Sequence, residues 1–157
     1  MSAVLKEIPL NMQPMQEQHL KQIMEIESVA YTHPWTEAIF QDCLRVGYCC
    51  WVLLRDNTVI GYGVMSVGAD ECHMLNICIK PDLQGNGFGR VMLEHLLETA
   101  QSHSATTAFL EVRPSNQVAI NLYESAGFNE VGMRRNYYPA IIGREDALIL
   151  ARSLNQT

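Results

Sequence analysis

Long apolar runs and clusters of basic residues are both missing from this sequence. Its apolar stretches stay below the roughly 18 residues of a transmembrane helix. Lys6 and Glu7 interrupt the first residues, which therefore lack the pattern of a secretory signal. The 11 Lys and Arg residues are dispersed among 17 Asp and Glu, and the formal net charge is −6. These absences argue against membrane and nucleic-acid partners and predict a cytoplasmic protein.

Metal-site spacing is also missing. The five cysteines contain no C-x-x-C pair, and the five histidines are scattered. Cys72 and His73 are neighbours, but no further ligand follows them at zinc-site spacing. We therefore expect no bound metal, and free thiols that are mostly buried.

Neither an internal repeat nor a linker-like segment divides the 157 residues, and we expect one domain over residues 1–157. Apolar periodicity predicts strands over 4–10, 48–55, 58–67, 71–80, 106–112, 130–137 and 145–152. It predicts helices over 15–30, 36–47, about 87–100 and 116–125. The resulting βααβββαβαββ order indicates an α/β fold with a mixed, mostly antiparallel sheet and one central β-α-β crossover.

Three glycines gather between a predicted strand and an amphipathic helix, in the segment Gln84-Gly85-Asn86-Gly87-Phe88-Gly89-Arg90. The first N–H groups of a helix have no partner within it, and the helix dipole adds partial positive charge there. Glycines remove the Cβ atoms that would block a phosphate, and Arg90 adds a cation. The segment predicts an anion cradle that suits a pyrophosphate. The alternative is a flexible loop without a ligand.

Two better-known nucleotide motifs fit this segment poorly. A dinucleotide-binding fingerprint needs G-x-G-x-x-G directly after a strand, whereas Gly85, Gly87 and Gly89 are spaced two apart and follow a Pro-Asp-Leu-Gln connection. A Walker A loop needs Gly-Lys-Ser/Thr, which the chain lacks.

The sequence resembles the GCN5-related N-acetyltransferase (GNAT) superfamily, whose signature Arg/Gln-x-x-Gly-x-Gly/Ala is matched by Gln84, Gly87 and Gly89. The resemblance implies a GNAT fold and acetyl-CoA as the co-substrate. It implies that residues 84–90 hold the pyrophosphate and that the backbone of Ile77, Cys78 and Ile79 contacts the pantetheine. Gly85 and Asn86 stand where close relatives often carry a basic or longer polar residue. Pyrophosphate binding would then depend more on backbone amides and Arg90.

Later segments resemble the RimI-type branch of that superfamily, which acetylates the N-terminal alanine of small-subunit ribosomal protein eighteen. They are residues 110–116, 122–129, 134–139 (Arg-Arg-Asn-Tyr-Tyr-Pro) and 143–147. The resemblance implies a groove for a peptide N-terminus shaped by Arg134, Arg135, Tyr137 and Tyr138, with Trp35 on the opposite wall. A basic, aromatic surface turn and a core role for Trp35 are the alternatives. Acetylation of a small amine or a protein lysine, and a non-catalytic acyl-CoA-binding module, are the competing functions.

Acetylation of an amine needs a base, because an α-ammonium group with a pKa of about 7.7–8.0 is mostly protonated at pH 7. Glu111 interrupts an apolar strand and points away from the side of Leu110 and Val112. It is the candidate general base, and a solvent-facing glutamate is the alternative.

The leaving thiolate needs an acid, and Tyr123 is the candidate. Asn116, Ile120 and Tyr123 are spaced i, i+4, i+7 and share one stripe of a predicted helix. Asn116 can bind pantetheine or cap the helix. The resemblance implies that Tyr123 lies beside the sulfur of CoA, whereas the plain alternative is a core tyrosine.

Overall fold

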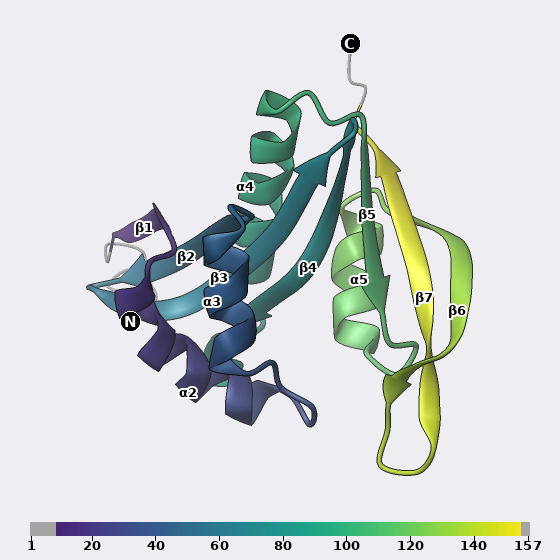
Figure 1. Cartoon of the computed structure of the whole chain (residues 1–157), viewed down its shortest axis with the longest axis horizontal. Coiled ribbons are helices and arrows are strands. Elements are labelled where there is room, and N and C mark those ends of the chain that lie inside the picture. Colours follow the sequence, from purple (N-terminus) through teal and green to yellow (C-terminus); the bar gives the residue numbers. More distant parts are fainter. Residues whose placement is uncertain (1–8, 155–157) are drawn as a thin grey trace. The chain divides into compact units, whose positions relative to one another are not determined.

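The computed structural model describes residues 9–154 (Figure 1). Its strands form a seven-stranded sheet in the order β1-β2-β3-β4-β5-β7-β6. By its contacts the chain divides into two compact units, Met1–Val64 with Asn76–Leu93, and Met65–Leu75 with Glu94–Thr157. Within residues 9–154, no helix has the length and apolar character to cross a membrane.

The first unit holds the N-terminal half of the secondary structure. Its complete elements are β1 (Leu10–Pro14), η1 (Glu17–His19), α2 (Leu20–Ala30), α3 (Glu37–Arg45), β2 (Cys49–Arg55) and η2 (Pro81–Leu83). Three elements run through both units, namely β3 (Thr58–Gly68), β4 (Glu71–Ile79) and α4 (Phe88–Ser102).

One apolar cluster organises the first unit. Ile23 of α2 and Phe40 of α3 pack with Val52 of β2 and Tyr62 of β3, and all four side chains are fully buried. Burial of these large side chains contributes roughly 1.5–3 kcal/mol each. The cluster therefore fixes α2 and α3 against these strands, and with them the segment that connects the two helices.

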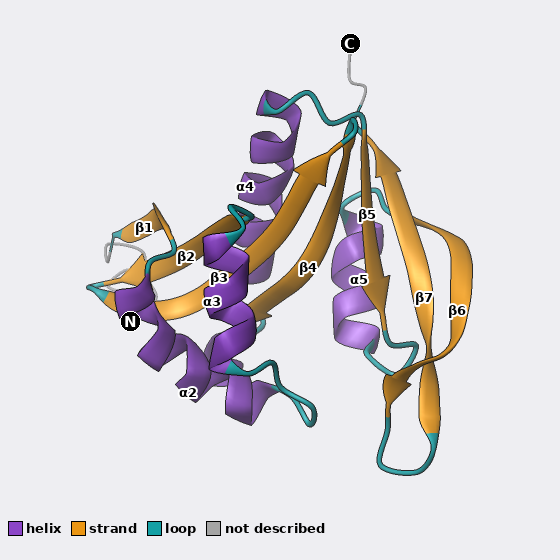
Figure 2. Cartoon of the chain, in the orientation of Figure 1, coloured by secondary structure: helices purple, strands orange, loops and turns teal. Residues whose placement is uncertain are grey.

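The second unit holds β5 (Thr107–Val112), α5 (Gln117–Ser125), β6 (Asn129–Pro139) and β7 (Arg144–Ser153). Strand β5 pairs in parallel with β4, and α4 lies between the two in the sequence, so the expected β-α-β crossover is present. Strand β7 pairs antiparallel with both β5 and β6. Figure 2 shows β6 and β7 as a long hairpin closed by one loop.

The predicted fold class and element order are confirmed, with β-α-α-β-β-β-α-β-α-β-β along the chain. Thr36 caps α3 by accepting a hydrogen bond from the Ile39 N–H (3.3 Å). Asp56 and Asn57 have φ values of 53° and 63°, which suits the tight turn expected between β2 and β3. The cysteines are free, and all except Cys49 are buried.

The first described strand extends further along the chain than the predicted 4–10. Residues 4–8 of the predicted strand lie outside the described residues, and the strand begins at Leu10. It continues past residue 10, the predicted end, through Asn11 to Pro14. The reason is pairing with β2, which extends from Leu10 opposite Arg55 to Pro14 opposite Trp51. Ladder hydrogen bonds outweigh the weak turn preference of one asparagine.

An irregularity in β6 is the main local feature that the sequence does not predict. The register against β7 shifts between Arg134 and Tyr138. Asn136 lies within the shift with a φ of 52°, a left-handed conformation that asparagine tolerates better than most residues. Its N–H donates to Asp146 Oδ1 (2.9 Å) and its carbonyl accepts from Arg144 Nε (2.7 Å). This bulge sets the direction in which the following tyrosines project.

Candidate active site

The glycine segment connects β4 to α4 inside the first unit. The side-chain amide of Gln84 donates to the carbonyl of Ile79 (3.0 Å) and ties the segment to the end of β4. Gly85 and Gly87 have φ values of 84° and 85°, where residues with a Cβ are strained. Helix α4 begins at Phe88, so the predicted boundary is confirmed.

Both glycines leave the space in front of the segment open. A Cβ added to Gly85 or to Gly87 would meet no heavy atom within 4 Å. The first amides of α4, from Phe88 onward, lie at the N-terminal end of the helix, where the dipole places partial positive charge. Open space in front of the glycines and a helix start are what an anion cradle requires, and the cradle itself stays a prediction.

The last part of β4 presents the backbone predicted to contact pantetheine. The Ile77 carbonyl accepts a hydrogen bond from the Tyr31 hydroxyl (3.1 Å). Cys78 and Ile79 are buried. Burial raises the pKa of the Cys78 thiol to about 11, so this thiol is a poor nucleophile at neutral pH. The Cys78 side chain therefore fits a role in core packing, and its backbone the predicted contact with pantetheine, better than the thiol fits a role as a nucleophile.

Glu111 lies in β5 of the second unit, where buried and half-buried residues alternate as predicted. Leu110 and Val112 are buried, whereas the Glu111 side chain is 27% exposed. Its Oε2 lies 3.3 Å from Arg134 Nε of β6. This contact lacks hydrogen-bond geometry and Oε2 has no other hydrogen-bond partner, so the two groups form an ion pair without a directed bond. The Glu111 carboxylate can therefore still accept a proton or a hydrogen bond.

Two tyrosines lie in the same unit as Glu111. Tyr123 of α5 is buried, with its ring edge-on to Phe128 at 5.9 Å. Burial raises the pKa of Tyr138 well above its ordinary value. Electrostatic repulsion raises it further, with contributions from Glu111, Tyr137 and Tyr123. Arg113, whose guanidinium lies 4.4 Å from the Tyr138 ring centre, lowers the same pKa in part. Tyr138 therefore stays protonated and can act as a hydrogen-bond donor beside Glu111.

Asn116 has the capping role that was one of its two predicted roles. Its side-chain oxygen accepts from the Ala119 N–H (3.2 Å) at the start of α5. The side-chain amide can still donate to a ligand, so the second role stays a prediction.

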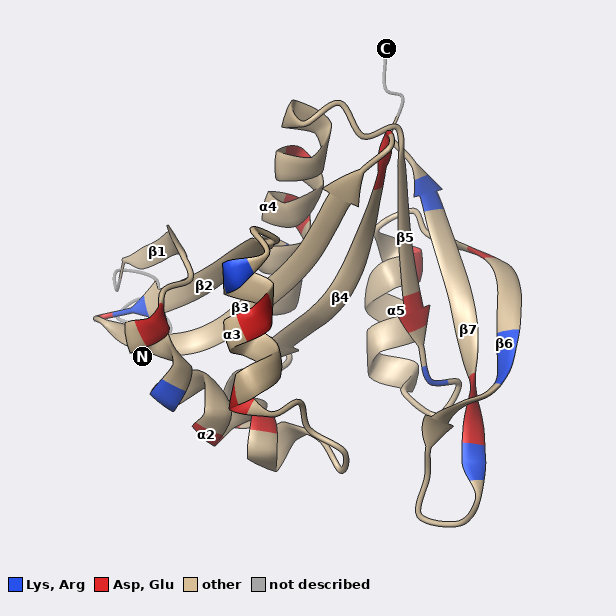
Figure 3. Ribbon diagram, in the orientation of Figure 1, with Lys and Arg blue, Asp and Glu red and all other residues tan. Residues whose placement is uncertain are grey.

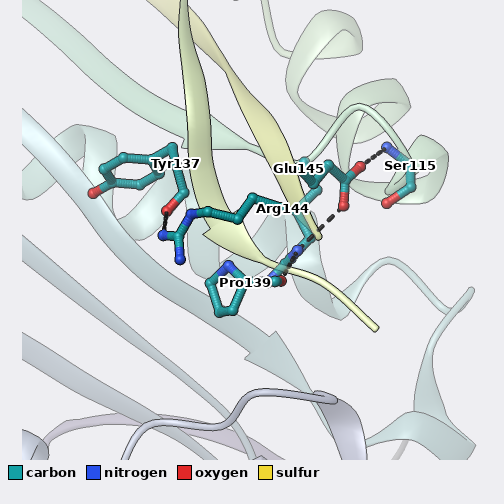
Figure 4. A network of polar contacts seen from close by, with 6 residues as sticks. Ser115, Tyr137, Pro139, Arg144 and Glu145 are labelled. Carbon is teal, nitrogen blue, oxygen red and sulfur yellow. Dashed lines mark hydrogen bonds and ion pairs between the residues drawn. The ribbon is translucent and has the colours of Figure 1, made fainter. Parts of the chain in front are cut away.

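The β6–β7 hairpin is held to the end of β5 by a polar network that the sequence did not single out (Figure 4). Glu145 accepts from Arg113 Nη1 (3.2 Å) and from the Ser115 N–H (2.9 Å). Arg113 Nη1 also donates to the Pro139 carbonyl (2.8 Å), and Arg144 donates to the Tyr137 carbonyl (2.9 Å). Figure 3 shows a basic and an acidic segment next to each other at the start of β7. The network fixes the backbone on both sides of Tyr138.

Replacing Glu145 by glutamine is expected to lower the free energy of unfolding by about 1 kcal/mol at pH 7, the scale of a lost charge-assisted bond. Hydrogen bonds from Ser115, followed by Arg113, hold the pKa of Glu145 below its ordinary value of 4.5. The contribution is therefore present above pH 4.5 and is lost as the pH falls through the lowered pKa. Urea unfolding at pH 7 and at lower pH should show the difference between wild type and variant shrinking. Glu124→Gln on the exposed face of α5 is the control, and a difference independent of pH would contradict this role.

The residues predicted to bind the acceptor are divided between the two units. Trp35, in the first unit, is partly buried against the apolar cluster, with its ring 5.2 Å from that of Phe40. Tyr137 is exposed on the hairpin, and its ring lies 5.4 Å from the Arg134 guanidinium. In residues 9–154, no three His, Cys, Asp or Glu side chains are grouped so as to hold a metal ion.

Known structures share this fold. The crystal structure of the ribosomal-protein-S18-alanine N-acetyltransferase from Escherichia coli superposes with a TM-score of 0.88 and 37% identity, covering 95% of this chain and 96% of that one. Ard1 from Thermoplasma volcanium superposes with a TM-score of 0.86 at 21% identity, covering 94% and 99% of the two chains, and shows the fold alone. The fold and the glycine segment together define the class, an acyltransferase that uses a CoA thioester.

Sequence comparison gives the family. Residues 18–128 match the profile of the Acetyltransferase (GNAT) family. The ribosomal protein bS18-alanine N-acetyltransferase of Escherichia coli K12 is 43% identical over 126 residues, which cover 80% of this chain and 85% of the relative. The corresponding enzyme of Haemophilus influenzae is 37% identical over 132 residues, covering 83% and 90%. The chain belongs to the GNAT family, and it is an N-acetyltransferase that uses acetyl-CoA as its co-substrate.

Proposed function

We propose that this enzyme transfers the acetyl group of acetyl-CoA to the N-terminal α-amine of the small-subunit ribosomal protein bS18, at an alanine. The observation that carries the proposal is the 43% identity to the Escherichia coli K12 enzyme with that acceptor in its name, over 85% of that enzyme. From a ribosomal acceptor we infer that the reaction takes place in the cytoplasm.

The geometry of the second unit supports a peptide acceptor. The Arg-Arg-Asn-Tyr-Tyr-Pro segment forms the bulged part of β6, and the Glu145 network fixes the backbone around it. Tyr137 and Tyr138 have ring centres 4.9 Å apart in an edge-to-face arrangement. They offer apolar surface with hydroxyl tips beside Arg134, and this combination suits a short polar peptide.

In the proposed reaction, the free amine attacks the thioester carbonyl carbon, the C–S bond breaks and an amide bond forms. Glu111 takes the proton of the attacking amine, directly or through a water molecule. Tyr123 gives a proton to the departing thiolate. Ile77, Cys78 and Ile79 hold the pantetheine through their backbone, and Asn116 contributes its side-chain amide. Gln84 to Arg90 hold the pyrophosphate.

The proposed acceptor is tested by thiol release from acetyl-CoA with a peptide that begins Ala-Arg. The expected result is turnover with the free N-terminus and none with the same peptide blocked there, because only an α-amine has an appreciable deprotonated fraction at pH 7. A blocked peptide that contains lysine and a panel of small amines complete the comparison. Turnover of the blocked peptide that contains lysine would show a lysine acceptor, and turnover of small amines alone would refute a protein acceptor.

A further inference from the structure

A carboxylate is buried in the first unit at a position that the reaction described above does not use. Glu27 of α2 is only 1% exposed. Its Oε1 accepts from the Tyr62 hydroxyl of β3 (2.6 Å) and from the Asn76 side-chain amide of β4 (3.2 Å). Its Oε2 accepts from the backbone N–H of Trp35 (2.9 Å). A buried carboxylate is costly unless hydrogen bonds satisfy it, so the three donors are held in place around it.

The partners of Glu27 belong to two different parts of the candidate site. Asn76 directly precedes the backbone proposed to hold pantetheine, and the Tyr31 hydroxyl joins Asn76 Oδ1 (3.2 Å) to the Ile77 carbonyl (3.1 Å). Trp35 belongs to the proposed acceptor wall. Oε1 of Glu27 therefore bonds to the cofactor side, and Oε2 bonds to the acceptor side.

We propose that Glu27 is a positioning residue that fixes the acceptor wall at Trp35 relative to the β4 backbone that holds acetyl-CoA. The inference rests on the proposed function, because it needs Trp35 to face the acceptor. Glu27 touches neither substrate and acts through the backbone N–H of Trp35. The distance between the two substrates thus depends on one buried side chain of α2.

Glutamine at position 27 can distinguish the contacts of Oε1 from the contact of Oε2 to Trp35. Its amide nitrogen replaces only one of the two carboxylate oxygens. In place of Oε1 it would face the amide donor of Asn76, whose Oδ1 already accepts from Tyr31. In place of Oε2 it would face a single donor, the N–H of Trp35. The second orientation loses fewer hydrogen bonds, so Glu27→Gln keeps the β4 side and releases Trp35.

The test is steady-state kinetics of Glu27→Gln with the free Ala-Arg peptide, together with the equilibrium Kd of acetyl-CoA. We expect the KM of the peptide to rise about tenfold, a change that corresponds to the loss of roughly one hydrogen bond. The Kd of acetyl-CoA should stay within about twofold. The matched control is Tyr62→Phe, which removes a donor to Oε1 but leaves the contact to Trp35 and should change the peptide KM by less than about twofold.

An unchanged peptide KM in Glu27→Gln overturns the inference. So does a parallel rise of peptide KM and acetyl-CoA Kd, or an equal rise in Tyr62→Phe, since each would indicate general loosening of the fold. If Glu27→Gln does not fold, Glu27→Asp replaces it. The shorter carboxylate cannot reach all three donors, and it keeps the two from Tyr62 and Asn76 in preference to the single N–H of Trp35, so the same split is expected. Lack of turnover by the wild type on the free peptide refutes the proposed acceptor, and the inference fails with it.

Discussion

Replacing Glu111 by glutamine is expected to lower turnover by about 10²–10⁴-fold, the usual contribution of a positioned general base. Glutamine keeps the size of the side chain and its place on β5 between buried Leu110 and Val112. It cannot accept the proton of the attacking amine. Because Glu111 lies in β5 and not in the glycine segment, the Kd of acetyl-CoA should be unchanged. Thiol release at saturating peptide and a separate acetyl-CoA titration measure the two quantities.

The control for this variant is Glu130→Gln, which changes an exposed glutamate of the same unit at the opposite end of β6 from the tyrosines. It should leave turnover within about twofold of the wild type. The turnover of Tyr123→Phe should lie between those of Glu130→Gln and Glu111→Gln. A phenol with a pKa of about 10 protonates a thiolate of pKa about 8.5 in a slightly unfavourable transfer, so the loss of this acid should slow the reaction without abolishing it. Turnover of Glu111→Gln close to that of wild type would contradict the base assignment and leave Glu111 as the partner of Arg134 alone.

Most of the fold could be predicted because its signals are local. Thr36 and Asn116 cap helices at the predicted starts, and Gly47 and Gly127, with φ values of 83° and 93°, follow α3 and α5 where glycine is favoured. The alternation of apolar residues along β5 identified Glu111 as the polar residue of its strand. Each of these features is determined by residues within a few positions of one another.

The features that could not be predicted depend on residues far apart in the sequence. The Tyr62 and Asn76 hydrogen bonds to Glu27 span 35 and 49 residues, and no periodicity indicates them. From the pattern alone, Glu27 is one more acidic residue on an amphipathic helix. The hydrogen bond between Ser115 and Glu145 spans 30 residues and joins the segment after β5 to β7, which pairs with β5. Motifs thus located the candidate chemistry, whereas only the three-dimensional structure shows what holds it in place.

Replacing Gly87 by valine is expected to raise the Kd of acetyl-CoA by more than about tenfold. Valine is strained at a φ of 85°, at a cost of about 1–3 kcal/mol. Its side chain would also fill the open space in front of the first amides of α4, where we propose that the pyrophosphate binds. Isothermal titration with acetyl-CoA and with CoA measures the effect, which should be equal for both because they share the pyrophosphate.

Gly47 provides the matched control, because strain alone could also weaken binding. It has a φ of 83° in the same unit, and a Cβ added there also meets no heavy atom within 4 Å, but it follows α3 and belongs to no proposed binding residue set. Gly47→Val should therefore lose stability as Gly87→Val does, while binding acetyl-CoA with the affinity of the wild type. Equal loss of affinity in both variants would attribute the effect to strain. Loss confined to Gly87→Val would attribute it to an anion that occupies the open space before α4, and the glycines would then be required for both the turn and the ligand.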